Sequence, residues 1–449
     1  MMTNFRIRAK FCWFSLILSF LFFGGKAQNN VNYYIEQAKA FSPLNKDVRN
    51  QSKINLLETE RLRAQNLKPQ ITFNAGYTLA PILLYDNNKP RIDINSQTSS
   101  TDYVGLDLGS TNGGNYQALF TVMQPIWASN RFKPLAEQLL LSNKINENNI
   151  ELTQHDIEKS VVDQYINCLL DLKQADFVSS IIKLIDEQRN IVLKLAAAAL
   201  AKESDVMLLN IERQKQVINL TTFQNNYRLH FLDLNVLCGI NDTTVKIIEP
   251  VDSTLDVRHW SLGIQNSNIQ YPTSNFRFLQ KYRLDSVNAM ITQEVFELKY
   301  KPQLNLLINA GLNGNYIPDF PKRFGWSAGL GFTVYIFDGK QKEINRSKTL
   351  LAVQTAANYK TSFLSQNSLR MMRLADEVRF LQNRQSLLDA QISEYQKLLF
   401  AYKSELVRGQ ISVLNIVTTL KDLTTLQQDF ITIQVQQQLL INAYNYWNW

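Results

Sequence analysis

The chain has 449 residues, a formal net charge of +8, 16 Gly, 11 Pro and 3 Cys. Residues 1–27 hold four basic and no acidic side chains, so the net charge of the rest is +4; the remaining charges of both signs are interspersed, which is typical of solvated surfaces and gives no support for nucleic-acid binding. The three His and the cysteines lack metal-ligand spacing, and we find no nucleotide or nucleophile motif, so we expect no cofactor, no metal site and no enzymatic activity.

The N-terminus has the pattern of a secretory signal peptide. Arg6, Arg8 and Lys10 precede an apolar run over 11–23, and Gly25-Lys26-Ala27 supplies small residues for cleavage after Ala27. The run is shorter than the ~20 residues that span a bilayer, although a retained anchor is the alternative. No Cys follows the run directly, so a lipid anchor is not indicated. The sequence therefore predicts export.

The rest of the chain contains two similar repeats. Lys68-Pro69-Gln70 before one strand pattern corresponds to Lys301-Pro302-Gln303 before another, and later landmarks recur at similar separations. We predict a first repeat over 28–240, an equatorial linker over 241–273 and a second repeat over 274–449. Each repeat is expected to run helix, strand, loop, strand, very long helix, turn, helix.

The predicted strands alternate apolar and polar residues with a period of two. They cover 71–78, about 118–126, 304–313 and 326–336. This pattern is typical of membrane barrel strands with lipid outside and water inside, or of a half-buried strand in a soluble sandwich. In the last strand the predicted lipid-facing side chains are Trp326, Leu330, Phe332, Val334 and Ile336, with Ala328 on the same face.

Four strands cannot close a barrel by themselves. Open sheet edges are excluded from lipid, and bacterial barrels have at least about eight strands. The barrel must therefore be shared between copies, and three copies give twelve strands with room for a pore.

Long helical patterns follow each strand pair, and the first of them contains no Gly. We predict helices over 131–200, 205–237, 340–406 and 412–446. The first would span roughly 105 Å at 1.5 Å per residue. Spacings of four and three near the end of the third predict a coiled-coil seam. Its members are Leu388, Ile392, Tyr395, Leu399, Tyr402 and Leu406.

These patterns together resemble the TolC family of outer-membrane efflux proteins over essentially the whole mature chain. The resemblance rests on the duplicated plan and on three segments: Gln124-Pro125-Ile126-Trp127, 234–239 (LNVLCG) and 406–417 (LVRGQISVLNIV). It implies an α+β membrane protein, internally duplicated, with four β-strands per protomer in a shared 12-stranded trimeric barrel and antiparallel helical hairpins forming a periplasmic α-barrel.

The function implied by the resemblance is a passive homotrimeric exit duct in the outer membrane, part of a tripartite efflux pump or a type I secretion system. Its implied partners are a periplasmic adaptor protein at the helical tips, an inner-membrane transporter acting through that adaptor, and outer-membrane lipid. The alternatives are a periplasmic coiled-coil adaptor or a scaffolding protein without a pore.

The resemblance also places site residues at the hairpin turns. Gly409 matches the family glycine and Ser412 the capping residue, while Lys202 is expected at the position equivalent to Gly409. The implied adaptor-docking tip comprises Lys202, Ser204, Arg408, Gly409, Gln410 and Ser412.

The implied periplasmic entrance, or gate, comprises Leu406, Ile411, Asn415 and Thr418. Family members carry aspartates where Asn415 and Thr418 stand, and an arginine and a tyrosine where Ile411 and Leu406 stand. We therefore expect a closed state held by apolar contacts and weak cation selectivity, unless Asp422 replaces the missing charge. Alternatively, Leu406 and Ile411 are ordinary seam residues.

Cys168 and Cys238 lie about equally far from the first turn on opposite arms of its hairpin. A disulfide is therefore one interpretation, and two buried free thiols are the other.

Overall fold

The computed structural model describes residues 30–79, 82–86, 89–93, 103–104, 114–126, 129–249, 277–314 and 321–449. The predicted signal peptide, Trp127, the glycine-rich segment 105–113 and linker residues 250–273 lie outside these ranges. Within them, no helix combines the length and apolarity that a membrane span requires. The chain forms two compact units, and each draws segments from both predicted repeats.

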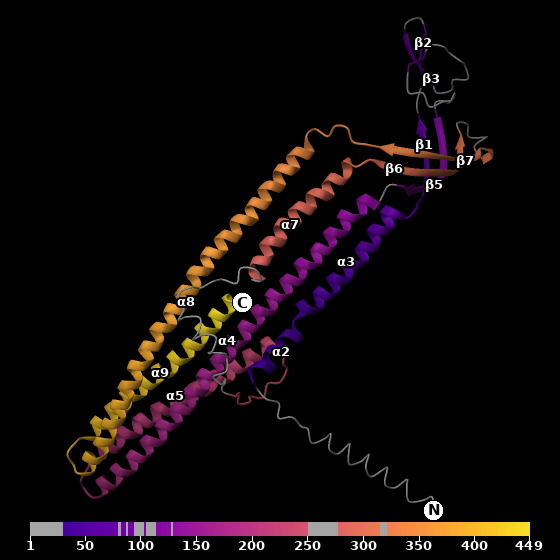
Figure 1. Cartoon of the computed structure of the whole chain (residues 1–449). Helices are drawn as coiled ribbons and strands as arrows, with labels where there is room; N and C mark the ends of the chain where they lie inside the picture. The colour runs from indigo at the N-terminus through magenta and orange to yellow at the C-terminus, as the bar shows by residue number, and fades with distance from the viewer. Residues whose placement is uncertain are drawn as a thin grey trace, which may run out of the picture. The chain divides into compact units, whose positions relative to one another are not determined.

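The first unit, here called the tip unit, comprises Met1–Lys46, Ile150–Arg277 and Ser362–Trp449. It holds helix α2 (Val31–Phe41), the C-terminal parts of α4 (Ser129–Ala197) and α8 (Gln341–Val407), and the return helices α5 (Glu203–Cys238) and α9 (Val413–Trp447). The four helices predicted after the strand pairs are thus confirmed to within a few residues. Figure 1 shows the α4–α5 and α8–α9 hairpins side by side.

Buried aliphatic side chains hold the two hairpins of the tip unit together. The largest cluster takes members from all four helices, including Ile185 of α4, Leu209 of α5, Leu399 of α8 and Leu420 of α9. The predicted seam residues Ile392, Leu399 and Leu406 are buried in it. Burial of one such side chain contributes about 1.5–3 kcal/mol. Packing between the helices is therefore the main source of their stability.

A second cluster of the tip unit fixes α2 and the start of the linker. Tyr34 and Ala38 of α2 pack against α4 and α5. The buried Tyr165 and Tyr227 donate their hydroxyl hydrogens to the carbonyls of Glu249 and Lys246, each at 2.6 Å. These bonds satisfy the phenol groups and hold residues 246–249 against the hairpin.

The second unit, here called the sheet unit, comprises Asp47–Asn149 and Phe278–Thr361. It contains most of α3 (Pro43–Leu67), the N-terminal parts of α4 and α8, most of α7 (Arg277–Glu297), and the short helix η1 (Leu298–Tyr300). Its main sheet is antiparallel in the order β1-β5-β6-β7. The strands are β1 (Gln70–Leu79), β5 (Gly114–Pro125), β6 (Gln303–Gly314) and β7 (Phe324–Thr333).

The register of this sheet places most apolar side chains on one face, although Leu119, Met123 and Leu307 lie on the other. Across the four strands, one row pairs Ile71, Val122, Ile308 and Ala328, and the next pairs Phe73, Phe120, Ala310 and Trp326. The intervening row is Thr72, Thr121, Asn309 and Ser327. Because neighbours in a strand point to opposite faces, this row lies on the other side of the sheet. There Thr121 Oγ1 donates to Asn309 Oδ1 at 2.8 Å.

The last strand ends earlier than the alternation predicts. β7 stops at Thr333, so the prediction that Val334 and Ile336 lie on this strand is wrong. Thr333 pairs with Gln303, the first residue of β6, and the residue before it is Pro302. Proline has no backbone N–H, so Pro302 cannot donate a hydrogen bond that would extend the ladder beyond Thr333. The sequence alternation nevertheless continues through residues 334–336.

The segment that connects β1 to β5 along the chain, where the sequence predicts only a loop, forms a small second sheet. Its strands are β2 (Ile82–Asp86), β3 (Lys89–Asp93) and β4 (Tyr103–Val104), in the order β3-β2-β4. Asp86 pairs with Lys89, so β2 and β3 form a hairpin with two residues between them.

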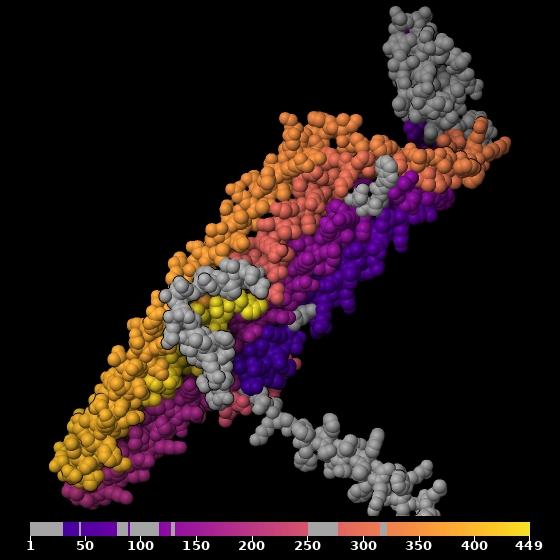
Figure 2. Space-filling view, in the orientation of Figure 1, coloured from indigo at the N-terminus to yellow at the C-terminus, as the bar shows by residue number. Residues whose placement is uncertain are grey.

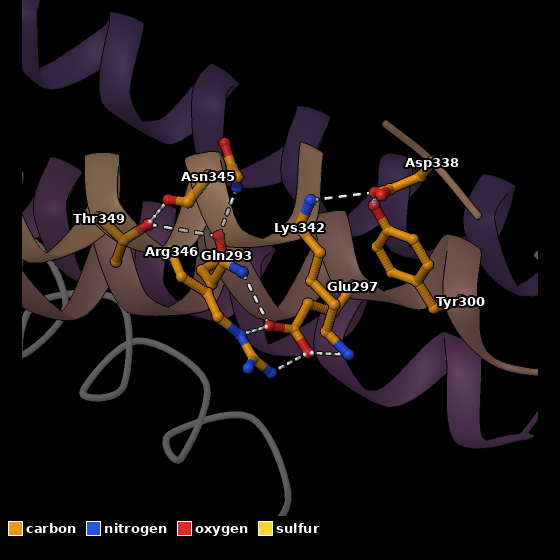
Figure 3. Close-up of polar contacts among 8 residues, drawn as sticks. All are labelled: Gln293, Glu297, Tyr300, Asp338, Lys342, Asn345, Arg346 and Thr349. Atoms are coloured by element: carbon orange, nitrogen blue, oxygen red, sulfur yellow. Dashed lines mark hydrogen bonds and ion pairs between the residues drawn. The ribbon is translucent and has the colours of Figure 1, made fainter. Parts of the chain in front are cut away.

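A polar network joins α7 to the first turns of α8 beside the main sheet (Figure 3). Glu297 accepts two hydrogen bonds from Arg346, at 2.7 and 3.0 Å, and lies 3.5 Å from Lys342 Nζ. Asp338 accepts hydrogen bonds from the Tyr300 hydroxyl and, at 3.0 Å, from the backbone N–H of Lys342. The hydrogen bonds from Arg346 are the main reason that the pKa of Glu297 falls to about 2. The network therefore fixes the angle at which α8 leaves the sheet.

Candidate functional site at the helical hairpin tips

The two turns at the ends of the hairpins have the same backbone design. Each contains five residues, 198–202 between α4 and α5 and 408–412 between α8 and α9. The N–H of Ala199 donates to Ala196 O and that of Gly409 to Leu406 O, both at 3.0 Å. The next N–H, of Leu200 or Gln410, reaches back five residues to a helical carbonyl. Both turns therefore satisfy carbonyls left open at a helix C-terminus.

This geometry corrects the equivalence expected from the sequence. Ala199 has φ +58° and Gly409 has φ +71°, so Ala199 is the residue equivalent to Gly409. Lys202 is not: it is the N-cap of α5 and corresponds to Ser412, the N-cap of α9. Alanine in the left-handed region carries a steric cost that glycine avoids. The first turn has the same shape as the second, built with a less suitable residue.

The caps of the two return helices differ in chemistry. The backbone N–H of Lys202 donates to the Asp205 carboxylate at 3.1 Å, which satisfies a polar group ahead of α5. Ser412 occupies the predicted N-cap position with an extended backbone, but its hydroxyl makes no capping hydrogen bond. The predicted role of Ser412 is thus confirmed for its position and wrong for its side chain.

The four predicted entrance residues fall into two pairs. Leu406 is 5% exposed and belongs to the core cluster of the tip unit, and Ile411 packs against that cluster. Their contacts within one chain favour the interpretation as ordinary seam residues. Asn415 and Thr418 are exposed on α9, as is Asp422 one turn further along. Neutral polar groups therefore occupy the exposed face nearest the turn.

All six predicted docking residues are exposed at the two turns, which Figures 1 and 2 show at the same end of the tip unit. Sequence reasoning missed that large apolar side chains are exposed beside them. These are Leu200, Met207, Val407 and Leu414. Leu200 and Val407 lie at or just outside the ends of predicted helices, and Met207 and Leu414 lie in the first turns of the predicted return helices. Large apolar residues beside a predicted turn were the sequence signal that could have found this surface.

Cys168 and Cys238 are free and buried in the second cluster of the tip unit. Cys238 Sγ donates to the carbonyl of Tyr34 at 3.3 Å. Burial raises the pKa of each thiol to about 12, so neither is a reactive thiolate at neutral pH. The structure therefore has the second of the two predicted arrangements, without a disulfide.

The predicted lipid-facing residues on β7 are strongly exposed in the single chain. Trp326 is 78% exposed, Leu330 67% and Phe332 63%. They continue the apolar rows of the neighbouring strands. Among the described strands, each outer strand of the main sheet, β1 or β7, is hydrogen-bonded on one side only.

Comparisons with known proteins show which fold this is. No family model and no curated protein sequence matches the chain. Among solved structures, CusC, studied for its folding and transmembrane channel formation, is 11% identical over 94% of this chain and 92% of its own, with a TM-score of 0.68. The outer membrane protein VceC of Vibrio cholerae is 12% identical over 93% and 95%, with a TM-score of 0.66.

The outer membrane channel MtrE of Neisseria gonorrhoeae, solved in its open state, is 12% identical over 93% of this chain and 89% of its own, with a TM-score of 0.64. The chain therefore has the fold of the TolC-type outer-membrane channels over 93–94% of its length.

Proposed function

We propose that this chain is one protomer of a trimeric outer-membrane channel of the TolC family, a passive exit duct that crosses the outer membrane and extends into the periplasm. The observation that carries the proposal is the main sheet: it has continuous apolar rows on one face, hydrogen-bonded polar groups on the other, and two outer strands with open edges. The shared fold with known channels supports it.

The trimer follows from closing that sheet. Open edges are not tolerated in lipid, so β7 of one copy must pair with β1 of the next. Because four antiparallel strands are an even number, that pairing is again antiparallel, and the pattern continues around a ring. Three copies give twelve strands, which leave an aqueous interior. The polar row of Thr72, Thr121, Asn309 and Ser327 then faces water.

The entrance in this proposal is lined by Asn415 and Thr418, which are exposed on α9. Rings of carboxylates make a pore select cations and bind multivalent ones, whereas rings of amides and hydroxyls do not. The channel is therefore weakly selective. Leu406 and Ile411 hold the hairpin ends through the core of each chain.

Planar-bilayer recording of the purified protein tests both the pore and its entrance. We expect discrete conductance steps, a modest preference for cations over anions, and no block by trivalent cations at low concentration. Strong cation selectivity that disappears in Asp422→Asn would move the selectivity to that residue. A chain that is soluble without detergent and gives no conductance would contradict the channel itself and favour a scaffolding role.

The hairpin tips are the proposed docking site for a periplasmic adaptor, which would connect the duct to an inner-membrane transporter of a tripartite pump or a type I secretion system. Leu200, Met207, Val407 and Leu414 are exposed near the polar docking residues, so the tips offer both the apolar and the polar groups that protein interfaces combine. Leu414→Asp should abolish export in cells without loss of trimer or conductance. Leu350→Asp, on the exposed surface of α8, is the matched control.

A further inference from the structure

A cavity of about 450 Å³ lies in the tip unit between α4, α8 and α9. Its apolar walls come from aromatic and branched side chains of all three helices, including Phe177 and Leu184 of α4, Phe400 of α8 and Leu423 of α9. The volume is in the range of pockets that hold small organic ligands. None of the residues discussed above as entrance or docking residues lines it.

The polar groups of the cavity are few and unbalanced in charge. Lys403 is its one charged lining residue, is half-buried, and has no carboxylate partner within the described part of the chain. Gln188 is 1% exposed, and among the described residues its Oε1 has no hydrogen-bond partner. Gln396, Gln427 and Ser180 complete the polar lining. An unsatisfied buried amide oxygen is costly and favours an occupant that donates to it.

We propose that this cavity is a binding site for a small amphipathic organic anion. The apolar body lies between Phe177, Leu184 and Leu423, an acidic group pairs with Lys403, and an O–H or N–H of the ligand donates to Gln188 Oε1. The charge decides the class: a cationic ligand would meet Lys403 with no acidic lining residue to offset the repulsion, and a purely apolar ligand would leave the Gln188 amide oxygen unsatisfied.

Such a ligand contacts both hairpins of the same chain, since α4 belongs to one and α8 and α9 to the other. It binds the present arrangement of the hairpins and not one in which they separate. By mass action it therefore stabilises this arrangement. The site rests on side chains of one protomer and does not depend on the proposed pore.

The experiment is a fluorescence titration of the purified full-length mature chain with 6-hydroxy-2-naphthoate, a fluorescent aromatic carboxylate whose hydroxyl is too far from its own carboxylate to donate to it. Buffer of the same detergent content is the blank. We expect saturable binding of one probe per chain. Lys403→Met should weaken binding about tenfold, since it removes one charge-assisted hydrogen bond, and Gln188→Leu should weaken it several-fold.

Lys421→Met, an exposed lysine of α9 outside the cavity, is the matched control and should bind like the wild type. The neutral probe 2-naphthol should bind more weakly than the naphthoate and be insensitive to Lys403→Met, which separates lost charge from altered packing. The proposal is overturned if the wild type shows no saturable binding, as it would if a neighbouring copy covers the cavity. Equal losses in Lys403→Met and Lys421→Met, or the same loss for both probes, would also overturn it.

Discussion

Single backbone conformations decide how the two turns of the tip unit compare. Both have one residue in the left-handed region, and only the second turn has glycine there. From the sequence, Gly409 predicted its own conformation, because glycine is the usual residue for positive φ. Ala199 gives no such signal, so the sequence matches Lys202, three residues further along, to Gly409. The equivalence of Ala199 and Gly409 is visible in the backbone conformation and not in the residue types.

Ala199→Gly should stabilise the first turn by about 0.5–1 kcal/mol, because it relieves the steric cost of alanine at φ +58°. Gly409→Ala should destabilise the second turn by about 1 kcal/mol at φ +71°. Hydrogen exchange of the tip amides measures both, with slower exchange expected in the first variant and faster in the second. Ala198→Gly, next to the strained position, should not reproduce the gain.

The two buried cysteines yield a direct chemical prediction. Because Cys168 and Cys238 are free and burial raises the pKa of each thiol to about 12, the mature chain should give two thiols when denatured without reductant. In the native state, maleimide labelling should be slow at neutral pH. A count of zero after denaturation would show the disulfide, and the Cys238 thiol could then not donate to Tyr34.

At the scale of elements, the long helices were the most predictable part of the chain. They lack glycine over whole lengths and carry a regular apolar seam, so their ends came out within a few residues. The strands were predicted by alternation, which a sheet follows only as far as a partner strand allows, and Pro302 ended β7 before Val334. The second sheet was missed because its strands are short and lie in a segment rich in Asn, Ser and Thr.

The network between α7 and α8 should make stability depend on pH. The pKa of Glu297, about 2, lies below its ordinary value of 4.5, chiefly because of the hydrogen bonds from Arg346. A lowered folded-state pKa means that this stabilisation is complete above pH 4.5 and is lost as the pH falls toward 2. Glu297→Gln should therefore destabilise the protein at pH 7, by about 0.5–1 kcal/mol because the pair is partly solvated.

Thermal unfolding of wild type and Glu297→Gln at pH 7, 4 and 2.5 measures this dependence. The difference between their Tm values should be largest at pH 7 and should shrink steadily toward pH 2.5. Glu343→Gln makes the same chemical change at an exposed carboxylate of α8 that has no ion pair within the described residues, and its Tm should follow that of the wild type. A difference independent of pH would show that Glu297 acts through packing.

At the scale of the whole molecule, the sheet and the hairpins are each incomplete in a single chain. The sheet has two open edges and exposed aromatic side chains, and the tips expose four large apolar residues. A solitary soluble protein rarely carries such surfaces. In the proposed channel each has a different cover: lipid and sister strands for the sheet, and an adaptor protein for the tips. The alternating pattern of the strands predicts from sequence that the sheet needs a cover. The exposed apolar residues at the tips were identified only from the structure of the turns.

The lipid-facing assignment is tested by placing one charge on either side of β7. Leu330 is 67% exposed on the apolar face, whereas Ser327 lies on the polar face, where its hydroxyl accepts a hydrogen bond from Asn309 Nδ2 at 3.4 Å. Arginine toward lipid costs about 2–4 kcal/mol per chain near the bilayer midplane, while arginine toward the lumen remains hydrated.

Leu330→Arg should therefore strongly reduce the heat-modifiable trimer in the outer-membrane fraction, since every chain of the trimer carries the charge. Ser327→Arg should assemble normally and shift the selectivity of the pore toward anions, because it adds a ring of positive charge inside. Normal trimer levels for Leu330→Arg combined with failed assembly of Ser327→Arg would reverse the two faces. Normal assembly and unchanged conductance of both variants would show that β7 does not separate lipid from water at all.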